Sequence, residues 1–496
     1  MSALLRTKSV EQSIADTQES EQSLSRTLGP IDLVVFGVGV IIGTGIFVLT
    51  GEAAGELAGP AVAISFVVSG LVCALAALCY AEFASTVPVA GSAYTFSYAS
   101  LGELFAWIIG WDLILELALG AATVASGWSD YFRTVLDETF GVNLPTFLDG
   151  DGHNLVAAAV VLAITALLCF GIQLSNRVNL VVVAIKVCVV LLVIVAGISY
   201  IKGANWDPFV PPSGSKPASG SPSDPSLLQD LGLGAGTFGV GGIFSGAALV
   251  FFAYIGFDIV ATAAEETKKP QRDMPIGIFG SLAICTTLYV AVSLVVTGMV
   301  PFDKIEVEAP LAAAFQSVGQ STIAQIVSFG ALAGLTTVML ILMLGQSRVF
   351  FAMSRDRLLP PFFAHVSKRY RTPYRSTIFT GVAVALLTGL VPLTTLAELV
   401  NIGTLFAFML VAAGVLVLRR TRPDLDRAFR TPLVPALPIV SVLASFYIML
   451  NLPAATWLRF AIWMAIGFVV YFLYARSHSR LAEGADTTSG TASPAS

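Results

Sequence analysis

The tripeptide Gly43-Thr44-Gly45 interrupts residues 31–50, an apolar stretch that is long enough to cross a bilayer. A membrane span needs about 20 apolar residues, and its backbone must satisfy its own hydrogen bonds because lipid offers none. Glycine in mid-span favours unwinding, which exposes amides and carbonyls. Because such an interruption is tolerated only where it lines a cavity or is buried in protein, we expect a ligand site at this point of the chain.

The composition is that of a polytopic membrane protein. Hydrophobic residues make up 56% of the 496 residues, charged residues make up 12%, and the mean hydropathy is +0.82. Residues 1–29 are polar and lack the apolar core of a signal peptide. The five cysteines lie in apolar segments without CxxC spacing, and the three histidines are scattered. We therefore expect no metal, no cofactor and no nucleic-acid partner, and the lipid bilayer as the surroundings.

Twelve apolar segments are predicted to cross the membrane. They are 31–51, 60–84, 98–127, 154–173, 178–201, 240–263, 276–300, 322–346, 377–395, 398–418, 434–452 and 457–475. If the N-terminus is inside, the inner loops and tails hold 21 Lys and Arg residues and the outer loops hold five. This asymmetry predicts a multi-pass protein of the cytoplasmic membrane with both termini in the cytoplasm.

A second interruption follows five segments later, because Gly256 and Asp258 lie at similar depth in residues 245–264. Interrupted segments at corresponding positions of two halves are typical of inverted-repeat transporters. The predicted fold is therefore an all-α integral membrane protein with 12 transmembrane helices and a five-plus-five inverted repeat in which helices 1 and 6 are broken. The predicted organisation is a disordered tail (1–29), the first repeat (30–201), an extracellular loop (202–239), the second repeat (240–418), two further helices with their preceding loop (419–476) and a disordered tail (477–496).

The two interruptions match the needs of a zwitterion. A carboxylate favours amides at a helix N-terminus, which Gly43, Thr44 and Gly45 would provide. An ammonium favours carbonyls at a helix C-terminus. The carbonyls expected to face it are those of Ile41, Phe252, Ala253 and Ile255. The alternative for the first interruption is close helix packing through small residues, since Gly39 and Gly43 form a GxxxG step.

Four ionisable residues at membrane depth are functional candidates, because buried charges in a membrane are costly. Glu116 and Asp258 either balance a cationic substrate side chain or brace the interrupted helices, whereas Asp112 is interpreted as structural. Lys186 lies within residues 178–200, and the alternative to a function is snorkelling to the cytoplasmic interface. Glu82, at the end of its segment, is interpreted as a cytoplasmic gate or brace rather than a ligand.

Several motifs resemble a known family. Gly-Val-Gly-Val-Ile-Ile-Gly-Thr-Gly-Ile-Phe-Val-Leu (37–49) and Phe-Ala-Tyr-Ile-Gly-Phe-Asp (252–258) are similar to those of the cationic amino acid transporter branch of the amino acid–polyamine–organocation superfamily, in its bacterial form. Further matching motifs lie at 88–96, 110–116, 265–275, 346–356 and 399–408. The resemblance implies the LeuT-like five-plus-five fold, substrate binding at the two interruptions and alternating access. It also implies that Lys186 couples transport to protons, at the place where sodium-coupled relatives bind a sodium ion.

Three features depart from the family pattern. Arg357 stands where the family often has glycine, and Leu117 stands where an aromatic residue is common. The eighth segment presents Leu340, Ile341, Leu342 and Met343 towards the expected side-chain pocket. A long cationic side chain fits poorly against these apolar residues, so the family name overstates a preference for arginine and lysine.

The expected function is that of a permease rather than an enzyme: proton-coupled uptake of L-amino acids, either cationic, such as arginine and lysine, or small and neutral, such as alanine. The partners are then an amino acid and a proton. An amino acid exchanger and a non-transporting amino acid sensor are the alternatives. The sequence leaves the oligomeric state open.

Overall fold

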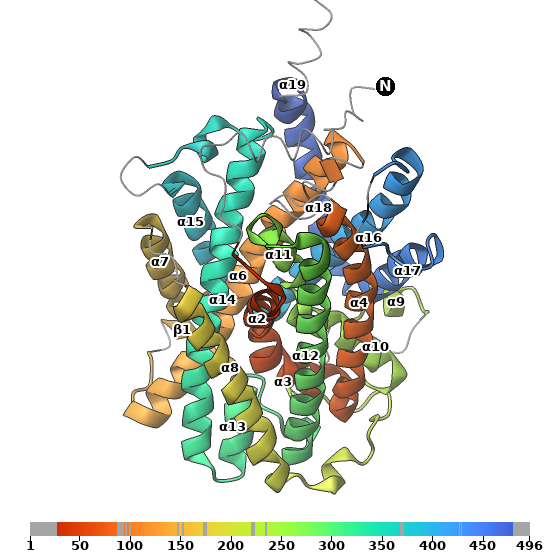
Figure 1. Cartoon of the computed structure of the whole chain (residues 1–496). Helices are drawn as coiled ribbons and strands as arrows, with labels where there is room; N and C mark the ends of the chain where they lie inside the picture. Colours follow the sequence, from red (N-terminus) through yellow and green to blue (C-terminus); the bar gives the residue numbers. More distant parts are fainter. Residues whose placement is uncertain are drawn as a thin grey trace, which may run out of the picture.

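The computed structural model describes residues 27–86, 94, 97–98, 101–145, 148–150, 153–171, 176–219, 224–233, 236–367, 372–425, 427 and 429–479. This part of the chain is mostly helical, and its long helices run roughly along one direction (Figure 1). Most of the two tails expected to be disordered lies outside the described residues. The motif at 88–96 also does, except for Tyr94.

Within these residues, eight helical stretches are long and apolar enough to cross a membrane. They are Gly45–Thr86, Glu103–Phe140, Val178–Tyr200, Gly239–Val260, Pro270–Met299, Ser321–Arg355, Leu393–Thr421 and Ala454–His478. Four shorter apolar helices accompany them: Pro30–Ile41, Leu155–Cys169, Tyr374–Leu390 and Ala436–Leu450. Each predicted segment overlaps one of these helices, whereas twelve crossings and an inverted repeat stay predictions.

The helices of Figure 1 keep their labels below. In chain order they are α2 (Pro30–Ile41), α3 (Thr50–Glu52), α4 (Val62–Thr86), α6 (Glu103–Phe140), α7 (Leu155–Cys169), α8 (Asn176–Gly197), α9 (Leu227–Asp230), α10 (Gly239–Val250), α11 (Phe257–Thr262), α12 (Pro270–Met299), α13 (Pro310–Ser317), α14 (Ser321–Arg355), α15 (Tyr374–Leu390), α16 (Leu393–Thr421), α17 (Ala436–Leu450), α18 (Ala454–Val470) and α19 (Arg476–His478). The strands β1 (Asp149–Gly150) and β2 (His153–Asn154) form a short antiparallel pair.

Helix α6 extends well beyond the end predicted at residue 127. Its last three turns carry charged side chains, among them Asp130 and Arg133, which form an ion pair of 2.7 Å. These charges lower the hydropathy that defines a membrane segment, although they do not oppose helix formation. The helix ends at Gly141, whose φ of +64° is the left-handed conformation that glycine accepts readily.

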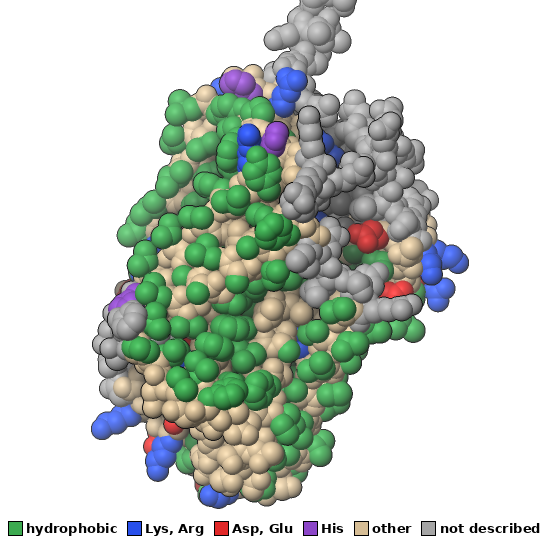
Figure 2. Space-filling model, turned by 90° about the vertical axis from the view of Figure 1, so that its left-hand side faces the viewer, with side chains coloured by type: hydrophobic (Ala, Val, Ile, Leu, Met, Phe, Trp, Pro, Cys, Tyr) green, Lys and Arg blue, Asp and Glu red, His purple; other side chains and the backbone are tan. Residues whose placement is uncertain are grey.

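The outward faces of the peripheral helices are apolar. On α8, for example, Leu180 is 54% exposed and Val195 is 70% exposed. Figure 2 shows one face of the molecule covered largely by hydrophobic side chains, with the Lys and Arg side chains of this face mainly near its ends. An apolar exterior of this extent suits contact with lipid chains.

The segment expected as an outer loop is tied to the helical bundle. The amide of Ala218 donates to the Gly55 carbonyl, and that of Phe238 donates to the Leu57 carbonyl. The Glu56 carboxylate also accepts hydrogen bonds from the amide and hydroxyl of Ser219. This segment therefore covers the π-helical turn Ala53–Ala58 that precedes α4.

Candidate functional site

The first interruption separates α2 from the π-helical turn Gly45–Leu49. Ile42 is extended (φ −72°, ψ 99°), and the Gly43 carbonyl accepts the amides of Ile46 and Phe47. The amides of Gly43 and Thr44 donate to no backbone carbonyl within the described residues. The Thr44 hydroxyl is also fully buried without a partner there. Buried donors left open at a helix start are suited to an anionic group.

The second interruption lies between α10 and α11. A 3-10 turn, Phe251–Tyr254, is followed by the extended Ile255 and by Gly256 with φ +122°. A Cβ at Gly256 would lie 2.7 Å from a methyl of Val40 on α2, so glycine permits both the backbone angle and the close approach. Asp258 accepts a hydrogen bond of 3.2 Å from the Gly256 amide, which supports the bracing interpretation of this carboxylate.

The two interruptions meet at the centre of the bundle. Gly45 packs directly on the backbone of Ala253, so a Cβ at residue 45 has no room. The hydroxyl of Tyr289, on α12, lies 2.7 Å from the Ile41 carbonyl and 2.9 Å from the Ala253 carbonyl. A single phenol thus joins two of the carbonyls that the sequence assigns to a substrate ammonium. The Phe252 carbonyl accepts the Ile255 amide at 3.2 Å.

Lys186 reaches the first interruption from α8. Its side chain is fully buried, and its Nζ donates to the Gly39 carbonyl over 2.7 Å. Gly39 has no side chain, and Val183 of α8 occupies the space beside it. Gly39 therefore combines close helix packing, against Val183, with a hydrogen bond from Lys186 to its carbonyl. A cation at the C-terminus of α2 is favoured by the helix dipole.

Two acidic residues of α6, Asp112 and Glu116, lie in the interior of the bundle. Asp112 is fully buried, both of its oxygens lack a partner among the described residues, and a Cβ at Gly403 of α16 would lie 2.7 Å from its Oδ1. Glu116 is 2% exposed, and its Oε1 likewise has no partner there. Both carboxyls are thus interior groups, as expected of acids at membrane depth.

Helix α14 supplies an apolar wall. Val338 lies next to Gly43, at 3.4 Å from the position of a Cβ. Leu342 packs against Gly120 of α6, and Met343 is buried. The α14 residue next to the first interruption, Val338, is therefore aliphatic, and so is Leu342 one turn further along the helix, which suits an uncharged side chain.

A cavity of about 280 Å³ lies on the side of the loop that follows α8. Its lining includes Glu52 and Glu56 before α4, Ser245 and Leu249 of α10, and Glu398 of α16. Leu249 is the next-to-last residue of α10, so the cavity reaches the last turn before the second interruption.

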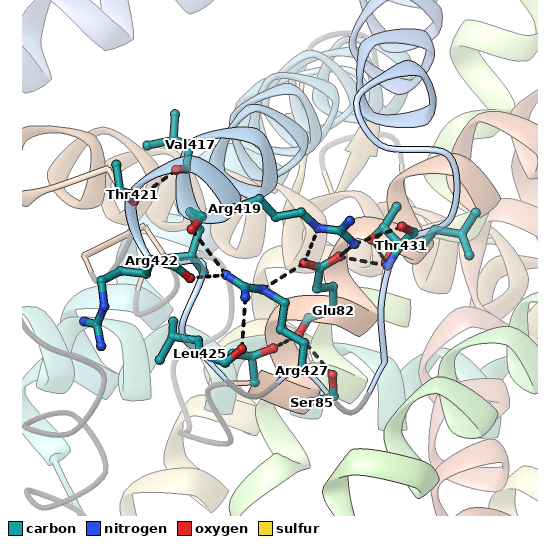
Figure 3. Close-up of polar contacts among 12 residues, drawn as sticks. Glu82, Ser85, Val417, Arg419, Thr421, Arg422, Leu425, Arg427 and Thr431 are labelled. Atoms are coloured by element: carbon teal, nitrogen blue, oxygen red, sulfur yellow. Dashed lines mark hydrogen bonds and ion pairs between the residues drawn. The ribbon is translucent and has the colours of Figure 1, made fainter.

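Glu82, near the end of α4, binds the last turn of α16 and the segment between α16 and α17 (Figure 3). Arg419 donates to its two carboxylate oxygens at 2.9 and 2.7 Å, the Thr431 amide donates at 2.8 Å, and Arg427 lies at 3.4 Å. This geometry supports the interpretation of Glu82 as a brace.

Two residues of this site carry no signal that the sequence analysis used. Tyr289 lies in an apolar segment where a tyrosine is unremarkable, and Asn401 drew attention only as part of the motif at 399–408. Asn401 donates to the carbonyls of Ala248 and Leu249. Both side chains donate to carbonyls at or beside the interruptions, and only the folded structure shows that these carbonyls lie within their reach.

An apolar helical exterior, together with two interrupted helices that meet at buried polar groups, defines an α-helical integral membrane protein with a central site. Residues 28–474 match the family described as "Amino acid permease". The chain belongs to this amino acid permease family, which confirms the resemblance found in the motifs.

Three relatives illustrate the range of the family. The branched-chain amino acid permease BcaP of Bacillus subtilis is 49% identical over 97% of this chain and 99% of that protein. The methylthioribose transporter of the same organism is 47% identical over 97% of this chain and all of that protein. The vacuolar cationic amino acid transporter 4 of Arabidopsis thaliana is 33% identical over 97% of both. These relatives are transporters whose names give different substrates.

Proposed function

We propose that this permease carries neutral aliphatic L-amino acids into the cell together with protons, by alternating access to the two interruptions. The observation that carries the proposal is the pair of open amides at Gly43 and Thr44, together with the carbonyls of Ile41 and Ala253 that converge on the Tyr289 hydroxyl. Amides suit the substrate carboxylate and carbonyls suit its ammonium.

The aliphatic wall of α14 supports an uncharged side chain, since Val338 and Leu342 offer no counter-charge to arginine or lysine. The similarity to a branched-chain amino acid permease points the same way. A cationic substrate would instead need a counter-charge for its side chain, and the buried carboxyl of Glu116 is the group that could supply it.

Lys186 is the proposed proton carrier. Burial disfavours its charged form, while the Gly39 carbonyl and the α2 dipole favour it. A lysine balanced in this way gains and loses a proton when its access to water changes. Because Lys186 donates to the Gly39 carbonyl, its protonation changes the contact that holds the end of α2 at the first interruption.

Counterflow into proteoliposomes tests the substrate class. Labelled L-leucine, L-alanine, L-arginine and methylthioribose are compared at equal concentration. We expect leucine and alanine to enter and arginine to enter weakly. Arginine as the preferred substrate would assign the side-chain site to Glu116, and uptake of methylthioribose alone would contradict the amino acid assignment.

An imposed proton gradient tests the coupling. With the interior alkaline, we expect leucine to accumulate above its external concentration, and Lys186→Gln to equilibrate leucine without accumulation. Equal accumulation by the variant and the parent would contradict the role of Lys186. If leucine enters only when the proteoliposomes contain amino acid inside, the protein is an exchanger instead.

A further inference from the structure

Asn401 of α16 holds the helix that leads into the second interruption. It is fully buried, and its Nδ2 donates to the carbonyls of Ala248 at 2.7 Å and Leu249 at 2.9 Å. Both carbonyls belong to the last turn of α10, directly before the 3-10 turn Phe251–Tyr254. The last carbonyls of a helix lack intrahelical donors, so the amide of Asn401 supplies donors where the helix type changes.

The same arrangement occurs at the first interruption. Helices α2 and α10 each contain 12 residues, and Gly39 and Ala248 are each the third residue from the end. Lys186 donates to the Gly39 carbonyl as Asn401 donates to the Ala248 carbonyl. The helices that carry these two donors, α8 and α16, are the last of the two repeats predicted from the sequence.

The two donors differ in charge chemistry. A lysine ammonium carries a charge that deprotonation removes, whereas a side-chain amide keeps its two N–H donors at every physiological pH. The Oδ1 of Asn401 is buried without a partner among the described residues, so donation by Nδ2 fixes the amide orientation. The reverse orientation would place Oδ1 against two carbonyl oxygens.

We infer that Asn401 is a positioning residue that fixes the second interruption independently of pH, as the uncharged counterpart of Lys186. The inference rests on the proposed function, since it assigns proton sensitivity to the first interruption alone. Through Ala248 and Leu249, Asn401 sets the direction in which α10 delivers the carbonyls that follow it, including that of Ala253. Its loss therefore weakens substrate binding without removing the response to protons.

Other ionisable groups lie on the elements around Asn401, and they stay unchanged in each variant below. They include Asp112 and Glu116 on α6, Tyr80, Cys73, Cys79 and Glu82 on α4, Tyr254 before α11, Asp258 on α11, Tyr447 on α17, Arg459 on α18, and Glu398, Arg419 and Arg420 on α16 itself. Within the described residues, α10 carries no ionisable side chain. Because all of these groups are common to parent and variant, a comparison of pH profiles isolates the replaced side chain.

The test is the affinity of purified protein for L-leucine between pH 5 and pH 8. Asn401→Leu removes both donors at nearly constant volume, and we expect about a tenfold weaker affinity at every pH, with the shape of the parental pH profile retained. Lys186→Gln is expected to show the opposite pattern, an affinity that no longer changes with pH. Asn451→Leu is the matched control, because that buried asparagine donates to the Tyr447 carbonyl on α17 and not to a carbonyl of α2 or α10.

The inference would be overturned by parental affinity in Asn401→Leu, or by a loss of its pH dependence like that in Lys186→Gln. An equal loss of affinity in Asn451→Leu would also overturn it. If Asn401→Leu does not fold, Asn401→Asp decides, because an ionised carboxylate repels the two carbonyls. As the pH is raised to 9, the affinity of Asn401→Asp for L-leucine should fall more steeply than that of the parent. A pH profile identical to that of the parent contradicts the inference. A parental protein that binds no amino acid refutes the proposed function instead.

Discussion

The hydroxyl group of Tyr289 is a hydrogen-bond donor to a carbonyl of each interruption. This hydroxyl lies within hydrogen-bond distance of the carbonyls of both Ile41 and Ala253, and the side chain is fully buried. Tyr289→Phe leaves both carbonyls without this donor, which costs about 1–3 kcal/mol in the free energy of unfolding. Because the two carbonyls then no longer converge on one donor, we also expect weaker leucine binding. Thermal unfolding and equilibrium binding of the purified variant measure the two effects.

Tyr254→Phe is the control for this prediction. Tyr254 lies in the same aromatic cluster, 5.5 Å from Tyr289 between ring centroids, but its hydroxyl donates to the Phe66 carbonyl on α4. It should lower stability to a similar extent with less effect on affinity. Equal losses of affinity in the two variants would show that Tyr289 acts only through stability.

At the scale of elements, the contact between the two interruptions depends on Gly45. The backbone of Ala253 occupies the place of a Cβ there, whereas a Cβ at Gly43 meets Val338 at an ordinary distance of 3.4 Å. Gly45→Ala must therefore separate the two interruptions, and we expect loss of leucine binding with normal membrane insertion. Gly43→Ala should insert equally well and keep the interruptions in contact. Retained binding in Gly45→Ala would refute a site formed between them.

The brace at Glu82 links α4 to the segment between α16 and α17. Glu82→Gln removes a buried carboxylate that binds Arg419 and the Thr431 amide, leaving a partly buried guanidinium without its charge partner. Breaking a buried pair costs about 3–5 kcal/mol, and the partial exposure of Arg419 lowers this figure. Thermal unfolding should therefore shift clearly downwards. Asp424→Asn, which breaks the exposed pair with Arg422, should leave it nearly unchanged, and equal shifts would contradict the brace.

The elements also show what the sequence could predict. The interruptions were predictable because glycine within an apolar segment has a direct backbone consequence, and Lys186 was identifiable because a lone charge in such a segment is costly. Tyr289 and Asn401 were not, because their partners are carbonyls that only the neighbouring helix exposes. Helix α6 continues more than three turns beyond the predicted membrane segment, since hydropathy marks the edge of the apolar region and not the end of the helix.

For the whole molecule, the remaining prediction concerns its orientation in the membrane. The distribution of basic residues predicts that both termini and the loop after α16 lie in the cytoplasm, and that the loop between α8 and α10 lies outside. In a variant without the five native cysteines, Lys216→Cys should react with a membrane-impermeant maleimide in intact cells. Asp424→Cys should react only after permeabilisation, because the bilayer shields it. The reverse labelling pattern would show that the protein has the opposite orientation. Substrate and proton would then have to enter from the opposite end of the bundle.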